Sequence, residues 1–281
     1  MMFGTRLHRA MQEKEPVCAG IDPHPHLLSL WKLPDSIDGL REFSFRALEG
    51  LESAAAIKPQ SAFFERFGAA GISVLEELLS QARERGVLTI LDVKRGDIGS
   101  TMDGYAKSYL IPGAPLEADA ITISPYMGPK AYEKTAQIAV ENNKGLFILV
   151  LTSNPEGHLL QRSLDRSGRT VAGQVLEWAQ TMNDQLCEQA HTGSFGAVIG
   201  ATVTDPQASL GESLSRFTGP ILAPGFGAQG GNIEQVKACF GPHLSRFLVS
   251  SSRSILQAGP NKFDLEEAVK KTANEVARAM Q

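Results

Sequence analysis

Short apolar runs alternate with longer amphipathic segments along the whole chain. The apolar runs are typical of buried parallel strands, and we predict strands over residues 17–21, 54–57, 87–93, 118–123, 146–151, 195–201, 220–223 and 247–250. The spacing of apolar positions between them predicts helices over residues 37–51, 72–85, 130–141, 171–188, 232–239 and 265–280. This alternation, without a break in composition, predicts an α/β fold in which residues 1–281 form a single (β/α)8 TIM-barrel domain.

An open, doubly wound sheet is the alternative arrangement of the same elements. The sequence favours the barrel, because no Gly-x-Gly-x-x-Gly motif follows the first predicted strand. One connection is long: residues 154–170, after the fifth predicted strand, are rich in Gly, Ser, Arg and Asp. We expect this loop to be a surface insertion, although loops of this length are often functional.

The composition limits the kinds of partner that the chain can have. With 42% hydrophobic residues, 21% charged residues and a net charge of −4, the 281-residue chain is an ordinary globular sequence with no basic run for nucleic acid. No apolar run is long enough for a membrane span. Cys18, Cys187 and Cys239 lie far apart in apolar surroundings, which favours buried, reduced thiols in a cytoplasmic protein. No Cys or His pair has zinc-ligand spacing.

The most unusual polar segment follows the third predicted strand. Asp92 and Lys94 occupy alternate positions and should therefore point to the same face, and Asp97 follows after a turn. A helix should open next, with Ser100 or Thr101 as its N-cap. Charges at the end of an apolar strand are costly to desolvate unless they are paired, and active sites are where such clusters are tolerated.

Lys58 stands at the end of the second predicted strand. The carboxyl ends of barrel strands meet at one rim, so Lys58 should join Asp92, Lys94 and Asp97 in a chain of alternating charge. The carboxylates would keep both lysines as ammonium groups. A permanently charged ammonium suits a proton donor or an electrostatic clamp, whereas a Schiff-base lysine needs a lowered pKa.

Two further segments predict an anion site. The loop at residues 225–231 is rich in glycine and precedes a predicted helix, so its backbone N–H groups can approach an anion closely. Arg253 follows three serines after the eighth predicted strand and can add a forked donor. Barrels often build a phosphate site from the loops after strands seven and eight. The sequence therefore predicts a substrate that carries a phosphate.

Together these motifs resemble orotidine 5'-phosphate decarboxylase, and in detail its longer, bacterial type 2 subfamily. The resemblance rests on Asp-x-Lys-x-x-Asp at residues 92–97, Lys58, Thr-Ser-Asn-Pro at residues 152–155, Pro-Gly-x-Gly-Ala-Gln-Gly-Gly at residues 224–231 and Arg253. It implies a homodimeric carboxy-lyase without cofactor or metal, which converts orotidine 5'-phosphate to uridine 5'-phosphate in de novo pyrimidine synthesis.

The resemblance also implies a role for each site residue. Lys94 would protonate C6 of the pyrimidine, held in place by Asp92 and Lys58. The other implied assignments are Asp22 to the ribose, Ser124 and Ser153 to the pyrimidine, Gln229, Gly230 and Arg253 to the phosphate, and Asp97, Ile98 and Thr101 to the active site of the neighbouring subunit.

Two other functions remain open. A metal-dependent sugar-phosphate lyase of the same superfamily, such as a keto-gulonate-phosphate decarboxylase or a hexulose-phosphate synthase, shares the Asp-x-Lys-x-x-Asp motif. Such enzymes carry an acidic metal ligand at the end of strand two, where this chain has Lys58. A non-catalytic barrel that binds a phosphate ligand is the second alternative, but it gives no reason for four clustered charges.

Overall fold

The structure, a computed structural model, describes residues 1–281 except 188–191, 204, 226–239 and 281. Eight strands form one sheet in the order β2-β1-β8-β7-β6-β5-β4-β3, and the paired neighbours are parallel. Bridges between Ile57 and Thr89 and between Gln60 and Asp92 join its two edges, so the sheet closes into a barrel. The strands are β1 Glu15–Ile21, β2 Ala54–Pro59, β3 Ile90–Arg95, β4 Ala120–Ile123, β5 Gly145–Leu151, β6 Phe195–Ile199, β7 Ile221–Pro224 and β8 Phe247–Ser251. The predicted (β/α)8 barrel is confirmed, and each predicted strand overlaps an observed one.

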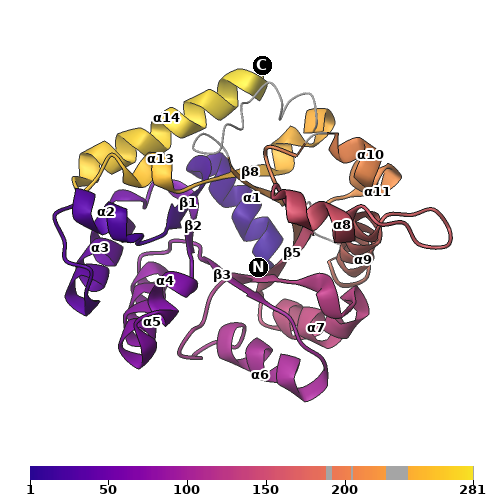
Figure 1. Ribbon diagram of the computed structural model, residues 1–281, viewed down its shortest axis with the longest axis horizontal. Coiled ribbons are helices and arrows are strands. Elements are labelled where there is room, and N and C mark those ends of the chain that lie inside the picture. The colour runs from indigo at the N-terminus through magenta and orange to yellow at the C-terminus, as the bar shows by residue number, and fades with distance from the viewer. Residues whose placement is uncertain (188–191, 204, 226–239, 281) are drawn as a thin grey trace.

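Helices surround the barrel between successive strands (Figure 1). The longer ones are α3 Ile37–Gly50, α5 Gly68–Glu84, α6 Gly99–Tyr109, α7 Glu133–Glu141, α9 Val171–Leu186 and α14 Lys262–Met280. Short helices fill the connections: α2 Pro25–Leu30, α4 Ala62–Glu65, α8 His158–Gln161, α10 Pro206–Leu210, α11 Glu212–Arg216 and α13 Arg253–Leu256. The 3-10 turns are η1 Pro125–Met127, η2 Pro129–Tyr132, η3 Pro155–Gly157 and η4 Gly241–Arg246. The helix predicted at residues 232–239 lies outside the described residues.

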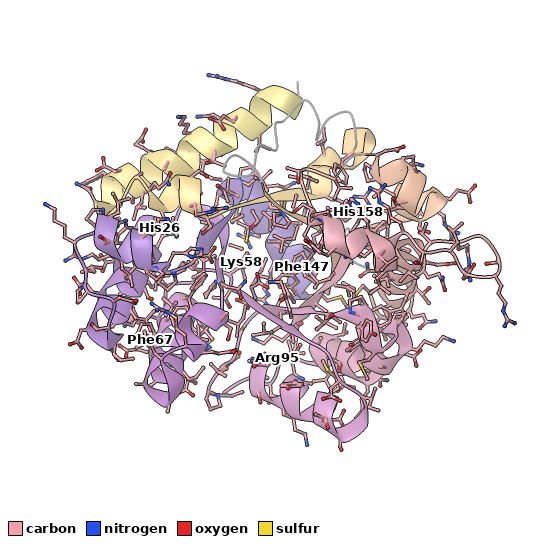
Figure 2. The ribbon with its side chains drawn as sticks, in the orientation of Figure 1. His26, Lys58, Phe67, Arg95, Phe147 and His158 are labelled. Carbon is pink, nitrogen blue, oxygen red and sulfur yellow. The ribbon has the colours of Figure 1, made fainter. Side chains whose placement is uncertain are left out.

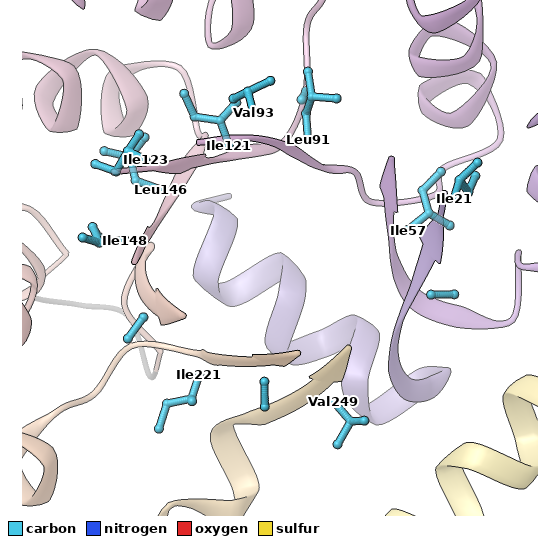
Figure 3. Packing of buried hydrophobic residues seen from close by; sticks show 14 of the residues in the cluster. Ile21, Ile57, Leu91, Val93, Ile121, Ile123, Leu146, Ile148, Ile221 and Val249 are labelled. Atoms are coloured by element: carbon cyan, nitrogen blue, oxygen red, sulfur yellow. The ribbon is translucent and has the colours of Figure 1, made fainter. Parts of the chain in front are cut away.

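Two apolar layers hold the barrel together. The outer layer lies between strands and helices, and Figure 3 shows side chains such as Ile57, Leu91 and Val249 pointing outward from the ring. The inner layer fills the barrel itself with residues from other strand positions, among them Cys18 and Phe147. Because neighbouring strand residues point to opposite faces, strands buried on both sides must be apolar at almost every position.

An N-terminal helix, which the sequence pattern did not predict, closes one end of the barrel. Helix α1, Phe3–Glu13, lies across the centre of the ring in Figure 1. Its residues Phe3 and Leu7 are fully buried in the inner layer, and the Phe3 ring meets the Phe147 ring edge-on at 6.1 Å between centroids. Its signal in the sequence is the pair of apolar residues spaced one helical turn apart.

Two local predictions need correction or refinement. The N-cap of α6 is Ile98, without a side-chain cap, so the predicted cap at Ser100 or Thr101 was wrong. The helix begins at Gly99, which places both hydroxyl residues within its first turn. The long connection at residues 154–170 contains η3, α8 and a bridge between Leu164 and Thr170, so it is partly ordered as secondary structure.

Within the described residues, no helix has the length and apolar character needed to cross a membrane.

Candidate active site

A cavity of about 630 Å³ opens at the carboxyl ends of the strands. Five residues predicted from the sequence line it. Lys58 lies in β2, Asp92 and Lys94 lie in β3, and Asp22 and Arg253 follow β1 and β8. Figure 2 shows Lys58 near the centre of the ring and Arg95 closer to α6. The α/β barrel therefore places these residues at the end where barrel enzymes carry their active sites.

Asp92 is the centre of the polar cluster in this cavity. Its Oδ1 accepts hydrogen bonds from Lys94 Nζ at 2.6 Å and from Thr122 Oγ1 at 2.9 Å. Its Oδ2 accepts from Lys58 Nζ at 3.0 Å and from Gln60 Nε2 at 3.1 Å. Each carboxylate oxygen thus has one cationic and one neutral donor, which compensates for the burial of a group that is only 7% exposed.

The charges in this cluster stabilise one another in their ionised forms. Burial alone would lower the pKa of Lys58, but the negative charges of Asp92 and Asp22 outweigh it and hold this pKa above its usual value. Burial alone would raise the pKa of Asp92, but Lys58 and Lys94 hold it well below its usual value. The side chain of Lys58 is 9% exposed, whereas that of Lys94 is 46% exposed. Of the two lysines, Lys94 is therefore the more accessible to a ligand in the cavity.

The backbone brings Lys94 to this position through an irregular strand end. Lys94 has a φ of 45°, in the left-handed region that non-glycine residues seldom adopt. Such a conformation costs on the order of 1–3 kcal/mol and persists only where the surroundings fix it. The pairing of β3 with β4 also shifts its register between Leu91 and Arg95. Simple strand alternation correctly predicted that Asp92 and Lys94 meet, but it did not predict this left-handed turn.

A second group of polar atoms lies at the β1 and β8 side of the cavity. Oδ1 of Asp22 and Oγ of Ser252 are buried and have no hydrogen-bond partner among the described residues. Buried polar atoms without partners are costly, and in a cavity they are positions where a ligand can supply the missing bond. His24 lies beside them with its ring 4.2 Å from that of Phe63, and burial lowers the pKa of His24. Arg253, the first residue of α13, lines the same side.

Several predicted residues do not line the cavity of this single chain. Asp97 accepts a hydrogen bond from the backbone N–H of Ile98 at 2.8 Å. The predicted chain of alternating charge holds for Lys58, Asp92 and Lys94 but does not extend to Asp97 within the described chain. Ile98 is 56% exposed. At the ends of β4 and β5, the cavity is lined by Thr122 and Thr152. The predicted residues outside the lining are Asp97, Ile98, Thr101, Ser124 and Ser153, and the predicted Gln229 and Gly230 lie outside the described residues.

Sequence reasoning missed Gln60 and Thr122, which are both bonded to Asp92. Gln60 follows Lys58 by two positions and thus shares its face, which was a usable signal. Thr122 gave a weaker one, as a single hydroxyl within the apolar run of β4, Ala120–Ile123. Threonine is common in strands, so its position alone does not indicate a role.

A sequence profile of the orotidine 5'-phosphate decarboxylase / HUMPS family matches residues 15–268. The chain belongs to this family. Proteins named orotidine 5'-phosphate decarboxylase from Salinispora arenicola and a Nocardioides species are 46% and 48% identical to it; the alignments cover 95% and 91% of this chain and 94% and 92% of the relatives. A crystal structure under the same enzyme name from Streptomyces avermitilis superposes with a TM-score of 0.92 at 43% identity, covering 99% of this chain and 96% of the other.

Proposed function

We propose that this protein is a carboxy-lyase that decarboxylates orotidine 5'-phosphate to uridine 5'-phosphate, with Lys94 as the proton donor and without a cofactor. The observation that carries the proposal is the Lys94 ammonium, held 2.6 Å from Asp92 Oδ1 and exposed to the cavity. The relatives named for this reaction, at 46% and 48% identity over nearly the whole chain, support it. The chain would act as a single catalytic domain.

The chemistry follows from the charges in the cavity. When the bond between C6 and the carboxylate breaks, carbon dioxide leaves and the electron pair stays on C6. An ammonium beside C6 stabilises this developing charge and then gives it a proton. Lys94, with its side chain 46% exposed, can regain a proton from solvent after each turnover. Asp92, beside the substrate carboxylate, would disfavour the bound ground state, and Lys58 would keep Asp92 ionised.

The remaining predicted residues would bind the parts of the substrate that do not react. Asp22 Oδ1, which is buried and has no partner among the described residues, suits a ribose hydroxyl. Arg253 suits the phosphate. Binding energy from these distant groups can be used at the reacting carbon. In the same proposal Gln229 and Gly230 bind the phosphate, and Ser124 and Ser153 contact the pyrimidine.

A homodimer with shared active sites is part of the proposal. Asp97 and Ile98 lie between β3 and α6, and Thr101 lies in the first turn of α6. The exposed Ile98 supports a contact with a second subunit. These three residues would complete the partner's site. The free, buried thiols of Cys18 and Cys187 support a cytoplasmic location, where cysteines stay reduced.

A metal-dependent sugar-phosphate lyase is less consistent with the site. Lys58 is at the end of β2, and its ammonium would repel a divalent cation there. In the described part of the chain, no three His, Cys, Asp or Glu side chains are grouped as metal ligands would be. A protein that only binds a phosphate ligand would have no use for the paired ammonium groups.

The test is the absorbance change of orotidine 5'-phosphate with chelator-treated protein. We expect turnover by the wild type and a loss of at least about 10²-fold for Lys94→Ala, since general acid catalysis contributes about 10²–10⁴-fold. Lys271→Ala, on the exposed side of α14, is the matched control and should keep full activity. Activity in Lys94→Ala equal to that of the wild type would show that another group is the acid. Turnover that returns only with added metal would favour the sugar-phosphate lyase.

A further inference from the structure

The hydroxyl of Thr122 has three partners at the floor of the cavity. Thr122 lies in β4 and is 2% exposed. Its Oγ1 accepts hydrogen bonds from the backbone N–H of Val93 at 3.0 Å and from that of Lys94 at 2.9 Å. The same hydroxyl donates to Asp92 Oδ1 at 2.9 Å. One side chain of β4 is thus bonded to three consecutive residues of β3.

These partners fix the direction of each bond. A hydroxyl has one proton to donate and two lone pairs to accept with. The two backbone N–H groups can only donate, so they occupy both lone pairs, and the proton must point to the carboxylate. Both lone pairs and the proton of the Thr122 hydroxyl are thus engaged, so the hydroxyl has a single orientation.

The position of this hydroxyl coincides with the irregular end of β3. Between the pairs Leu91–Ile121 and Arg95–Ile123, β3 advances by four residues and β4 by two. Within this stretch Lys94 takes its φ of 45°. Thr122 is the β4 residue at the centre of the shift, and it bonds the N–H of Lys94 directly.

We propose that Thr122 is a positioning residue for the proton donor. Its hydroxyl holds Lys94 at two points: the backbone N–H, and the Oδ1 atom of Asp92 that accepts from the Lys94 ammonium. Thr122 therefore fixes both the backbone of Lys94, from which the side chain extends, and the carboxylate oxygen that binds the ammonium at its tip. This inference rests on the proposed role of Lys94 in decarboxylation.

The position of the ammonium should affect turnover more than substrate binding. A displacement of about 1 Å at a reacting group can cost on the order of 10²-fold in rate. The groups proposed to bind ribose and phosphate are Asp22 and Arg253. In the described chain the Thr122 hydroxyl is bonded to Asp92, Val93 and Lys94, so its loss would leave Asp22 and Arg253 in place. Loss of the hydroxyl should therefore lower kcat and leave KM nearly unchanged.

The test compares Thr122→Val, which keeps the shape but has no hydroxyl, with Thr122→Ser, which keeps the hydroxyl. We expect kcat to fall about 10²-fold in the valine variant, with KM within about 3-fold, and serine to restore most of the rate. The control is Thr89→Val: Thr89 is also 2% exposed, and its hydroxyl bonds Asp119 just before β3 begins, at the other end of that strand. It should leave kcat unchanged.

Several outcomes would overturn the inference. These are a valine variant with wild-type kcat, a rise in KM that accounts for its whole loss, a serine variant as slow as valine, or an equal kcat loss in Thr89→Val. If Thr122→Val does not fold, Thr122→Cys replaces it, since a thiol is a weak partner for hydrogen bonds; it should be at least about 10-fold slower than Thr122→Ser.

A crystal structure of Thr122→Val separates this inference from the proposed function. We expect Lys94 to leave its positive φ or its Nζ to move out of hydrogen-bond distance of Asp92 Oδ1. Lys94 in its original position would overturn the inference, whatever the activity. Absence of decarboxylation by the wild type would instead overturn the proposed function.

Discussion

Lys58 and Lys94 bind opposite oxygens of one carboxylate, with Lys58 Nζ 3.0 Å from Asp92 Oδ2 and Lys94 Nζ 2.6 Å from Asp92 Oδ1. The three side chains carry a net positive charge, which suits an anionic substrate. The buried Lys58 and the more exposed Lys94 also have different surroundings. Asp92 thus binds one lysine that is buried in the protein, Lys58, and one that faces the cavity, Lys94.

Replacing Asp92 by Asn should destabilise the protein strongly. The change leaves Lys58, with its side chain 9% exposed, without the carboxylate that forms its ion pair. Breaking a buried ion pair in this way costs about 3–5 kcal/mol, and urea unfolding would measure it. Asp35→Asn is the control, because Asp35 pairs with Arg66 at the surface, where water screens the ion pair, and its loss should cost far less. Equal costs for the two variants would contradict the importance of the buried pair.

The same pair makes a prediction for the pH dependence of stability. The folded pKa of Asp92 is lowered, so its contribution is present above the unfolded pKa of about 3.9 and is lost as pH falls below it. The folded pKa of Lys58 is raised, so its contribution is present below the unfolded pKa of about 10.4 and is lost as pH rises above it. In Asp92→Asn the main charge that opposes the effect of burial on the pKa of Lys58 is gone, so Lys58 loses its proton at lower pH in the variant. The difference in unfolding free energy between wild type and Asp92→Asn should therefore be constant between about pH 5 and pH 7 and shrink towards both extremes of pH. A difference that changed steadily between about pH 5 and pH 7 would contradict this assignment.

Arg253→Met should weaken binding of the phosphate. The variant keeps much of the apolar stem of the side chain but loses the charged donor that lines the cavity. A hydrogen bond to a charged group contributes about 1.5–3 kcal/mol, so KM for orotidine 5'-phosphate should rise about 10- to 100-fold. Orotidine without its phosphate should react equally with wild type and variant. A similar loss for both substrates, or a loss of the same size in the exposed control Arg278→Met, would contradict a phosphate contact.

Phe3→Ala should reduce stability and leave catalysis intact. Phe3 is fully buried in the inner layer, where its ring packs on Phe147, and it does not line the cavity. Loss of such a ring costs about 3–5 kcal/mol, measurable by urea unfolding, while kcat at low temperature should stay at the wild-type value. Phe263, which is 72% exposed, provides the control: its change to Ala should cost within about 0.5 kcal/mol. A fall in kcat for Phe3→Ala in fully folded protein would show that α1 also shapes the site.

Much of the site was predictable because strand geometry is regular. The two-residue period of a strand put Asp92 and Lys94 on one face, and the barrel rule put Lys58 and Arg253 at the same end. The prediction failed where side chains from different strands must be placed relative to one another. Thr122 and Gln60 meet Asp92 only because β4 and β2 flank β3 in a particular register. Asp97 does not line the cavity, and its Oδ1 accepts a hydrogen bond from the adjacent Ile98 N–H.

The sequence by itself determined the elements, the barrel and the rim that carries the charged residues, because apolar periodicity and strand alternation are local properties of the chain. It also determined the family, because its motifs lie at fixed positions within the chain. Only the tertiary structure decided that α1 closes the barrel, that Lys94 takes a positive φ, and that the Thr122 hydroxyl holds it. These features depend on the register between strands and on packing between distant segments, and no local pattern specifies either.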